Sequence, residues 1–311
     1  MTNNENLLQV NNLTISFGKG KKKTHAVSDV SFHVNKGETF GIVGESGSGK
    51  TTLGRSIMRL YMPDNGEIFY KNEKISGKIS TKKDRELTKK IQMIFQDPMS
   101  SLNERAKVDY IIAEGLYNFG DITAQERERR IAKVMNEVGL HRDFGGRFPH
   151  EFSGGQRQRI GIARVLIVEP ELIIADEPIS ALDVSIRAQV LNLMSRLKRE
   201  HNLTYIFISH DLSVMQFICD RIAAMYKGKI VEMADTETLF NKPLHPYTKS
   251  LLSAVPLPDP RKEKLRQIIP YSSEIHEYEK DPPIWHEIES GHYVYANRYE
   301  IDEFEKILSK I

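Results

Sequence analysis

A glycine-rich loop between a strand and a helix constrains the fold of this chain most. The loop follows the apolar segment Thr39 to Val43 and precedes a helix-like segment. Glycines let successive backbone N–H groups face a polyphosphate, Lys50 can reach its outer phosphates, and the Thr51 hydroxyl can bind Mg²⁺. An ordinary glycine turn would need a chance match at four fixed positions, so the sequence predicts nucleotide binding. The loop residues are Gly44, Glu45, Ser46, Gly47, Ser48, Gly49, Lys50, Thr51 and Thr52.

A second glycine motif lies about a hundred residues further on and begins a helix. Ser153 and Gln156 form a capping-box pattern, which is a structural role. Gly154 and Gly155 also leave the helix N-terminus bare, so that a phosphate can approach its N–H groups and positive dipole. The motif alone leaves both interpretations open.

Polar residues follow three predicted strands. The apolar run Leu172 to Ala175 ends in Asp176 and Glu177, where α/β sheets place their ligands. Asp176 can hold the Mg²⁺ of MgATP, usually through water, and Glu177 can polarise the attacking water. Gln96 can reach the metal and this water, and His210 can contact the γ-phosphate. A lone Gln or His at a strand end is more often structural than catalytic, but here each follows a strand in the order that a shared active site would use.

The order of predicted elements indicates an α/β fold with a mostly parallel sheet. Strands are expected at 8–17 and 27–34 before the loop, and at 91–95, 172–175 and 203–209 after it. Helices are expected at 106–119, 124–138, 184–198 and 212–218, and a hairpin turn at 226–228.

The composition of the chain excludes some functions and indicates where the protein works. The net charge of +2 over 311 residues argues against a nucleic-acid binder. A single cysteine, Cys219, allows no disulfide within the chain and indicates a reducing compartment. No apolar run approaches the ~18 residues of a spanning helix, so we expect another polypeptide to hold the chain at any membrane. Basic segments at 19–23 and 71–90 are expected to be solvated loops.

Together these motifs resemble the nucleotide-binding subunit of ABC transporters over residues 7 to about 255. The resemblance adds a D-loop at Ser180 to Asp183, with Asp183 at the nucleotide, and an adenine-stacking role for Phe17. It implies a P-loop ATPase core with a mixed sheet, a β subdomain and an inserted helical subdomain at about 97–168. It also implies that two subunits dimerise head to tail, with each ATP between one phosphate loop and the other subunit's signature at 152–156. Phe152 stands where leucine is commonest.

A finer resemblance is to the F-type ATPase subunits of oligopeptide permeases, notably those of Gram-positive bacteria. The segments 95–103, 245–256 and 285–294 carry it. It implies an ATP-hydrolysing importer subunit at the cytoplasmic membrane face, with a paralogous ATPase, two permeases docked near Gln96 and an extracellular solute-binding lipoprotein as partners. His245 and His292 are expected to start a helix and to pack the tail, not to bind metal.

The resemblance divides the chain into two parts. They are an ATPase domain at 1–255 and a C-terminal extension at 256–311, which has a net charge of −4. The extension could brace the dimer, restrain its closure or cover the core. The cargo stays open between peptides and nickel, glutathione or an oligosaccharide. A soluble ABC ATPase acting on ribosomes or DNA is a weaker alternative, because such proteins typically carry two cassettes or a long coiled-coil insertion. A simple kinase leaves the signature and His210 unexplained.

Overall fold

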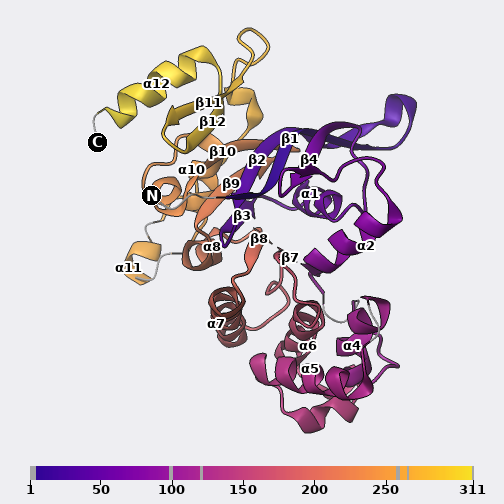
Figure 1. The fold of residues 1–311 in the computed structure, drawn as a ribbon. Coiled ribbons are helices and arrows are strands. Elements are labelled where there is room, and N and C mark those ends of the chain that lie inside the picture. The colour runs from indigo at the N-terminus through magenta and orange to yellow at the C-terminus, as the bar shows by residue number, and fades with distance from the viewer. Residues whose placement is uncertain (1–4, 98–100, 120–121, 257–259, 265, 310–311) are drawn as a thin grey trace.

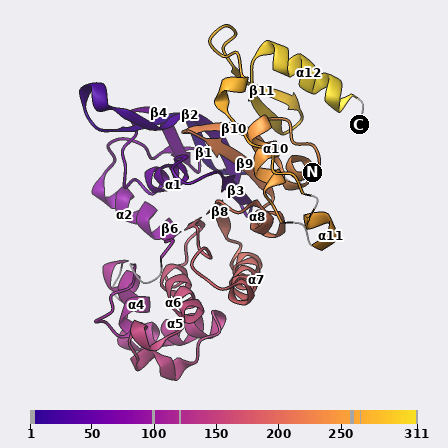
Figure 2. The same ribbon diagram turned by 180° about the vertical axis from the view of Figure 1, so that it is seen from behind.

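The protein is described here from a computed structural model that covers residues 5–97, 101–119, 122–256, 260–264 and 266–309. Residues 98–100 of the Gln96 segment and 1–4 of the polar N-terminus lie outside the described residues. The elements form two sheets, a helical block on one side and a C-terminal addition on the other (Figures 1 and 2).

An eight-stranded sheet forms the centre of the molecule. Its inner strands are apolar and fully buried, which is typical of parallel strands covered on both faces. Five neighbouring strands are parallel and the remaining three are antiparallel, so the predicted mixed sheet is confirmed. In spatial order the strands are β11 (Ile284–Glu289), β12 (His292–Ala296), β10 (Lys229–Asp235), β9 (Arg221–Tyr226), β3 (Thr39–Val43), β8 (Thr204–Ser209), β7 (Leu172–Asp176) and β6 (Ile91–Ile94).

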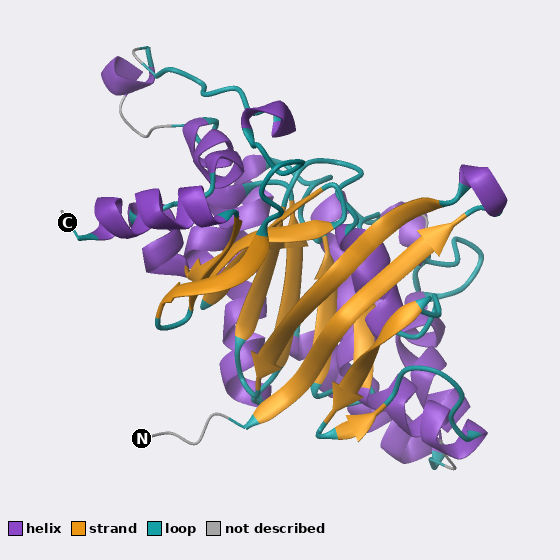
Figure 3. Ribbon diagram, turned by 90° about the horizontal axis from the view of Figure 1, so that it is seen from above, coloured by secondary structure: helices purple, strands orange, loops and turns teal. Residues whose placement is uncertain are grey.

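A four-stranded antiparallel sheet crosses over this one (Figure 3). Its long strands alternate buried and exposed residues, and the buried side chains share a core with β3 and with α1 (Lys50–Ile57). The rings of Phe32 and Phe40 stack across this core at 4.9 Å. The core therefore fixes the strand that leads into the glycine-rich loop. The sheet's strands are β2 (Thr24–Asn35), β1 (Asn6–Phe17), β4 (Asn65–Tyr70) and β5 (Glu73–Lys74).

The helical block follows the carboxyl end of β6 and leads into β7, and it lies to one side of the sheets (Figures 1 and 2). Its two predicted helices form close to their expected bounds, and the helix after the second glycine motif begins at Gly154. Buried aliphatic side chains of these helices form one core with β7 and β8. The helices of the block and those that follow it are α4 (Val108–Phe119), α5 (Ala124–Glu137), α6 (Gly154–Leu166), α7 (Val184–His201) and α8 (Leu212–Ile218), with short 3₁₀ turns at Arg142–Gly146 and Pro149–Glu151.

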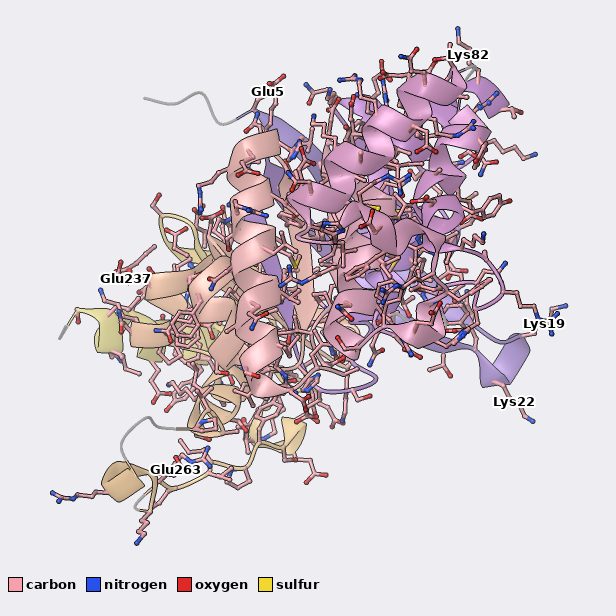
Figure 4. All side chains as sticks on the ribbon, turned by 90° about the horizontal axis from the view of Figure 1, so that it is seen from below. Glu5, Lys19, Lys22, Lys82, Glu237 and Glu263 are labelled. Carbon is pink, nitrogen blue, oxygen red and sulfur yellow. The ribbon has the colours of Figure 1, made fainter. Side chains whose placement is uncertain are left out.

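The expectation of a solvated loop at 71–90 is wrong for its second half, which forms α2 (Thr81–Lys90). Ser80 caps this helix by accepting a hydrogen bond from Lys83 N, and a single buried residue, Leu87, anchors it. A helix with one buried apolar residue among several lysines shows no hydrophobic periodicity, so the sequence did not predict it. The basic segment near Lys19 is the tip of the β1–β2 hairpin and holds a 3₁₀ turn at Gly20–Lys22, and Lys19 and Lys22 project from the body (Figure 4).

The C-terminal extension supplies two strands of the eight-stranded sheet, because β12 pairs antiparallel with β10. The side chain of Glu232 is fully buried at this junction and lies 2.8 Å from His292 Nε2. His245 caps the helix that follows it, with Nδ1 accepting from Tyr247 N at 3.1 Å. The helix-start role of His245 and the packing role of His292 are thus confirmed. The remaining elements are α9 (Thr236–Asn241), α10 (Pro246–Ser253), α11 (Pro260–Glu263), a 3₁₀ turn (Ser273–Ile275) and α12 (Arg298–Leu308).

Candidate active site

The phosphate loop runs from the end of β3 to the start of α1, and its neighbours fix its shape. Gly49 has φ of 106°, and a Cβ there would lie 2.1 Å from the carbonyl oxygen of Ala26, so only glycine fits. Gly228 N, from the β9–β10 turn, donates to Ser48 O at 2.9 Å. Contacts from other parts of the chain therefore fix the shape of the loop. Of its other predicted residues, Glu45, Ser46 and Gly47 are exposed and Thr52 is half-buried in the first turn of α1.

Lys50 is buried inside this loop. Its Nζ donates to the carbonyl oxygens of Gly44 at 2.7 Å and Glu45 at 2.8 Å and to Ser48 Oγ at 3.3 Å. Burial lowers the pKa of Lys50, and neighbouring carboxylates, foremost that of Glu177, oppose this shift. The ammonium group is thus held at the loop by neutral acceptors that phosphate oxygens can replace.

Thr51 and Asp176 come together from the start of α1 and the end of β7. Thr51 Oγ1 donates to Asp176 Oδ1 at 3.0 Å, and Asp176 is only 2% exposed. Burial raises the pKa of Asp176, while the hydrogen bond from Thr51 opposes this shift. A hydroxyl and a carboxylate form a set of hard oxygen donors, which suits Mg²⁺. The donors present therefore fit the expected metal.

Glu177 is the centre of a second cluster at the same edge of the sheet. Its Oε2 accepts a hydrogen bond from Gln96 Nε2 at 3.0 Å and lies 3.2 Å from His210 Nδ1. Because β7 lies between β6 and β8, these partners approach the carboxylate from opposite sides. Glu177 has φ of 45°, an uncommon conformation for a residue with a side chain. A strained, tethered carboxylate is typical of a functional position.

The other predicted site residues do not join this cluster within one chain. Helix α6 lies in the helical block, apart from α1 (Figures 1 and 2). Ser153 and Gln156 close a reciprocal capping box, with Ser153 N donating to Gln156 Oε1 at 3.0 Å. Gly154 and Gly155 approach Leu182 and Ile186 beside the D-loop. Asp183 is exposed at the start of α7, and Phe17 is 43% exposed with its ring edge-on to Tyr61.

A cavity of about 590 Å³ lies next to Gln96, between the sheet and the helical block. It is lined by residues of α2, α4 and α6 and reaches Asp176. Arg164, on its α6 side, donates to Ser101 O at 2.5 Å, and burial lowers its pKa. The cavity therefore lies between the candidate catalytic residues and helices of the helical block.

Sequence reasoning missed one contact of the phosphate loop. Tyr247, in α10, is fully buried and its hydroxyl accepts a hydrogen bond from Glu45 N at 3.0 Å. The two residues are 202 positions apart, so no local pattern could pair them. In the sequence analysis, the segment 245–256 indicated only a resemblance to a subfamily, and it suggested no role for the Tyr247 hydroxyl.

The fold and this cluster define an ATPase of the ABC class. Residues 27–180 match the ABC transporter family, and residues 231–281 match the C-terminal region of oligopeptide/dipeptide transporters. The chain is 58% identical to an oligopeptide transport ATP-binding protein of Streptococcus pyogenes serotype M1, with 98% of this chain and 99% of that protein covered. A protein of the same description from Bacillus subtilis is 51% identical, with 96% of this chain and 99% of that protein covered.

The chain belongs to the family of oligopeptide transport ATP-binding proteins. Its structure is also similar to the dimeric ATP-binding cassette MJ0796 bound to ADP and phosphate in a post-hydrolysis state, with a TM-score of 0.67 and 28% identity. That match covers 74% of this chain and 98% of the cassette.

Proposed function

We propose that this chain binds and hydrolyses ATP to power an oligopeptide importer. The observation that carries the proposal is the meeting of Gln96, Glu177 and His210 at the edge of the sheet that also holds the phosphate loop. Relatives over nearly the whole length are described as oligopeptide transport ATP-binding proteins, which favours peptide over the other cargoes.

The proposed chemistry is phosphoryl transfer to water by positioning and charge neutralisation. The loop N–H groups and Lys50 bind the phosphates, and Lys50 exchanges its carbonyl partners for phosphate oxygens. Thr51 and Asp176 would hold Mg²⁺, with Gln96 as a further ligand, and the metal would neutralise charge on the β- and γ-phosphates. Glu177 orients the attacking water and accepts its proton, while His210 contacts the γ-phosphate.

The proposal requires a second ATPase subunit. Helix α6, whose N-cap and first turn carry Ser153, Gly154, Gly155 and Gln156, lies apart from α1 and the phosphate loop before it (Figures 1 and 2). A head-to-tail partner would bring an equivalent helix N-terminus to that loop. Asp183 would complete the nucleotide site at the dimer interface. The exposed Phe17 would stack on the adenine. A similar cassette is dimeric with ADP and phosphate, which supports this arrangement. We expect the partner in the transporter to be a paralogue.

The cavity beside Gln96 is the proposed docking site for the permease subunits. It adjoins Asp176 and the helical block, so a segment inserted there would act on the cluster directly. Across the described part of the chain, no helix has the length and apolar character to cross a bilayer. We propose that the chain works at the cytoplasmic membrane face, with an extracellular solute-binding lipoprotein as an indirect partner and no nucleic acid.

Peptide uptake tests this function directly. Cells with wild-type protein should import a labelled tetrapeptide or pentapeptide, and cells with Lys50→Ala or Glu177→Gln should not. The mutant complexes must be shown to be expressed and assembled, and Lys82→Ala, at an exposed lysine (Figure 4), serves as the control. Normal peptide uptake with assembled Lys50→Ala protein would assign the ATPase to another cargo. Unchanged ATPase activity of the Glu177→Gln complex would contradict the catalytic assignment.

A further inference from the structure

One peptide group of the phosphate loop is held from both ends by side chains. The carbonyl oxygen of Gly44 accepts from Lys50 Nζ at 2.7 Å, and the N–H of Glu45 donates to the Tyr247 hydroxyl at 3.0 Å. These two backbone atoms belong to the same planar peptide unit, so their partners together fix its orientation. That orientation sets the direction in which the loop leaves β3.

Two aromatic rings from other parts of the chain pack against the Tyr247 ring, and His245 holds its backbone. The ring of Tyr226, at the end of β9, lies 4.6 Å away between centroids, and the ring of Tyr271, in the C-terminal extension, lies 5.3 Å away. The Tyr271 hydroxyl is 3.0 Å from His276 Nε2 in the same extension. His245 caps α10 through Tyr247 N. The hydroxyl is therefore pre-positioned, and little conformational freedom remains to be lost when the loop is used.

We propose that Tyr247 is a positioning residue for nucleotide binding, acting through the Gly44–Glu45 peptide. This inference rests on the proposed function, in which Lys50 leaves its carbonyl acceptors for phosphate oxygens. The peptide then loses its lysine contact, and the Tyr247 hydroxyl is the side-chain contact that still orients it. Tyr247 itself does not touch the nucleotide. The C-terminal extension, through Tyr271, thereby helps to order the phosphate loop.

The test is Tyr247→Phe, which removes one oxygen and keeps the ring. A net hydrogen bond of this kind corresponds to a factor of roughly three to ten. We expect the Kd of the full chain for ATP and the KM of the assembled transporter to rise by about that factor, with kcat within twofold of wild type. Such a split indicates lost binding that is equal in ground and transition states. The matched control is Tyr205→Phe, because the buried Tyr205 hydroxyl has no hydrogen-bond partner among the described residues.

Several results would overturn the inference. They are an unchanged Kd for Tyr247→Phe, a fall in kcat at constant KM, or an equal rise in KM for Tyr205→Phe. Lys50→Ala separates this failure from failure of the proposed function. If Lys50→Ala lowers ATP affinity and Tyr247→Phe does not, only the positioning role is wrong. If Lys50→Ala binds ATP as wild type does, the assignment of the loop itself is wrong.

Discussion

The two contacts of the Glu177 carboxylate make a double-mutant prediction. Gln96 Nε2 and the His210 ring both approach the same oxygen, Oε2, at 3.0 and 3.2 Å, from the strands on either side of β7. Removing one tether leaves the carboxylate drawn toward the other. Because its position is then already lost, removing the second tether should add little. We therefore expect Gln96→Ala and His210→Ala to be strongly non-additive.

The magnitude follows from exposure. Hydrogen bonds to a charged group contribute about 1.5–3 kcal/mol when buried, but both tether side chains are exposed, so about 1 kcal/mol each is the better figure. This corresponds to roughly a fivefold fall in kcat for each single substitution. Independent effects would multiply to about 25-fold. We expect the double variant to fall by only about five- to tenfold, a coupling energy of about 0.5–1 kcal/mol.

The assay is ATP hydrolysis by the assembled transporter at saturating MgATP. His141→Ala, at an exposed histidine on the helical block, is the control and should leave kcat unchanged. A further direct contact of Gln96 or His210 with the reacting groups would add to each single effect without changing the sign of the coupling. A double variant whose fall in kcat equals the product of the two measured single falls would refute the opposed-tether reasoning.

Other regions of the structure make three further predictions. The buried Glu232 carboxylate accepts from two backbone N–H groups and contacts His292, so Glu232→Gln should lower the unfolding temperature by roughly 2–5 °C, while exposed Glu237→Gln should not. Burial lowers the pKa of His245 to about 3, so the unfolded chain binds a proton that the native chain does not between about pH 6.5 and 3. Stability should therefore fall as pH drops through this window, and His245→Asn, which keeps a capping acceptor, should flatten the slope in denaturant titrations. Ser153→Ala removes the cap of α6, at a cost of about 1 kcal/mol, and should speed amide exchange in its first turn several-fold.

The edge of the sheet that holds the candidate site was predictable from sequence because Gln96, Asp176 and His210 each follow a parallel strand. Parallel strands place their carboxyl ends together, so the sequence order of these residues already implies a shared edge. The partners within that edge were not predictable. That Gln96 and His210 share one oxygen of Glu177 depends on the strand order β8-β7-β6 and on side-chain conformations.

Elements held mainly by distant contacts escaped the sequence analysis. Strand β12 is held by its pairing with β10, some sixty residues earlier. The buried partner of His292 is Glu232, which the sequence alone indicates only as a polar residue in a strand. Local periodicity carries no information about such pairs. The same reason explains the missed contact of Tyr247, whose hydroxyl meets the phosphate loop through a hydrogen bond across 202 positions of the chain.

The architecture of the extension also decides how its role can be tested. Truncation after Pro256 would strip β12 from the edge of β10 and leave the fully buried Glu232 carboxylate without His292. A buried charge that loses a partner destabilises a fold strongly, so lost activity in the truncated chain would follow from the damaged sheet alone. Tyr271→Leu leaves this strand pair intact. It removes the ring against Tyr247, together with the ring contact to Tyr226 and the hydroxyl contact to His276. If the extension orders the phosphate loop, this substitution should weaken ATP binding while the unfolding temperature stays within a few degrees of wild type.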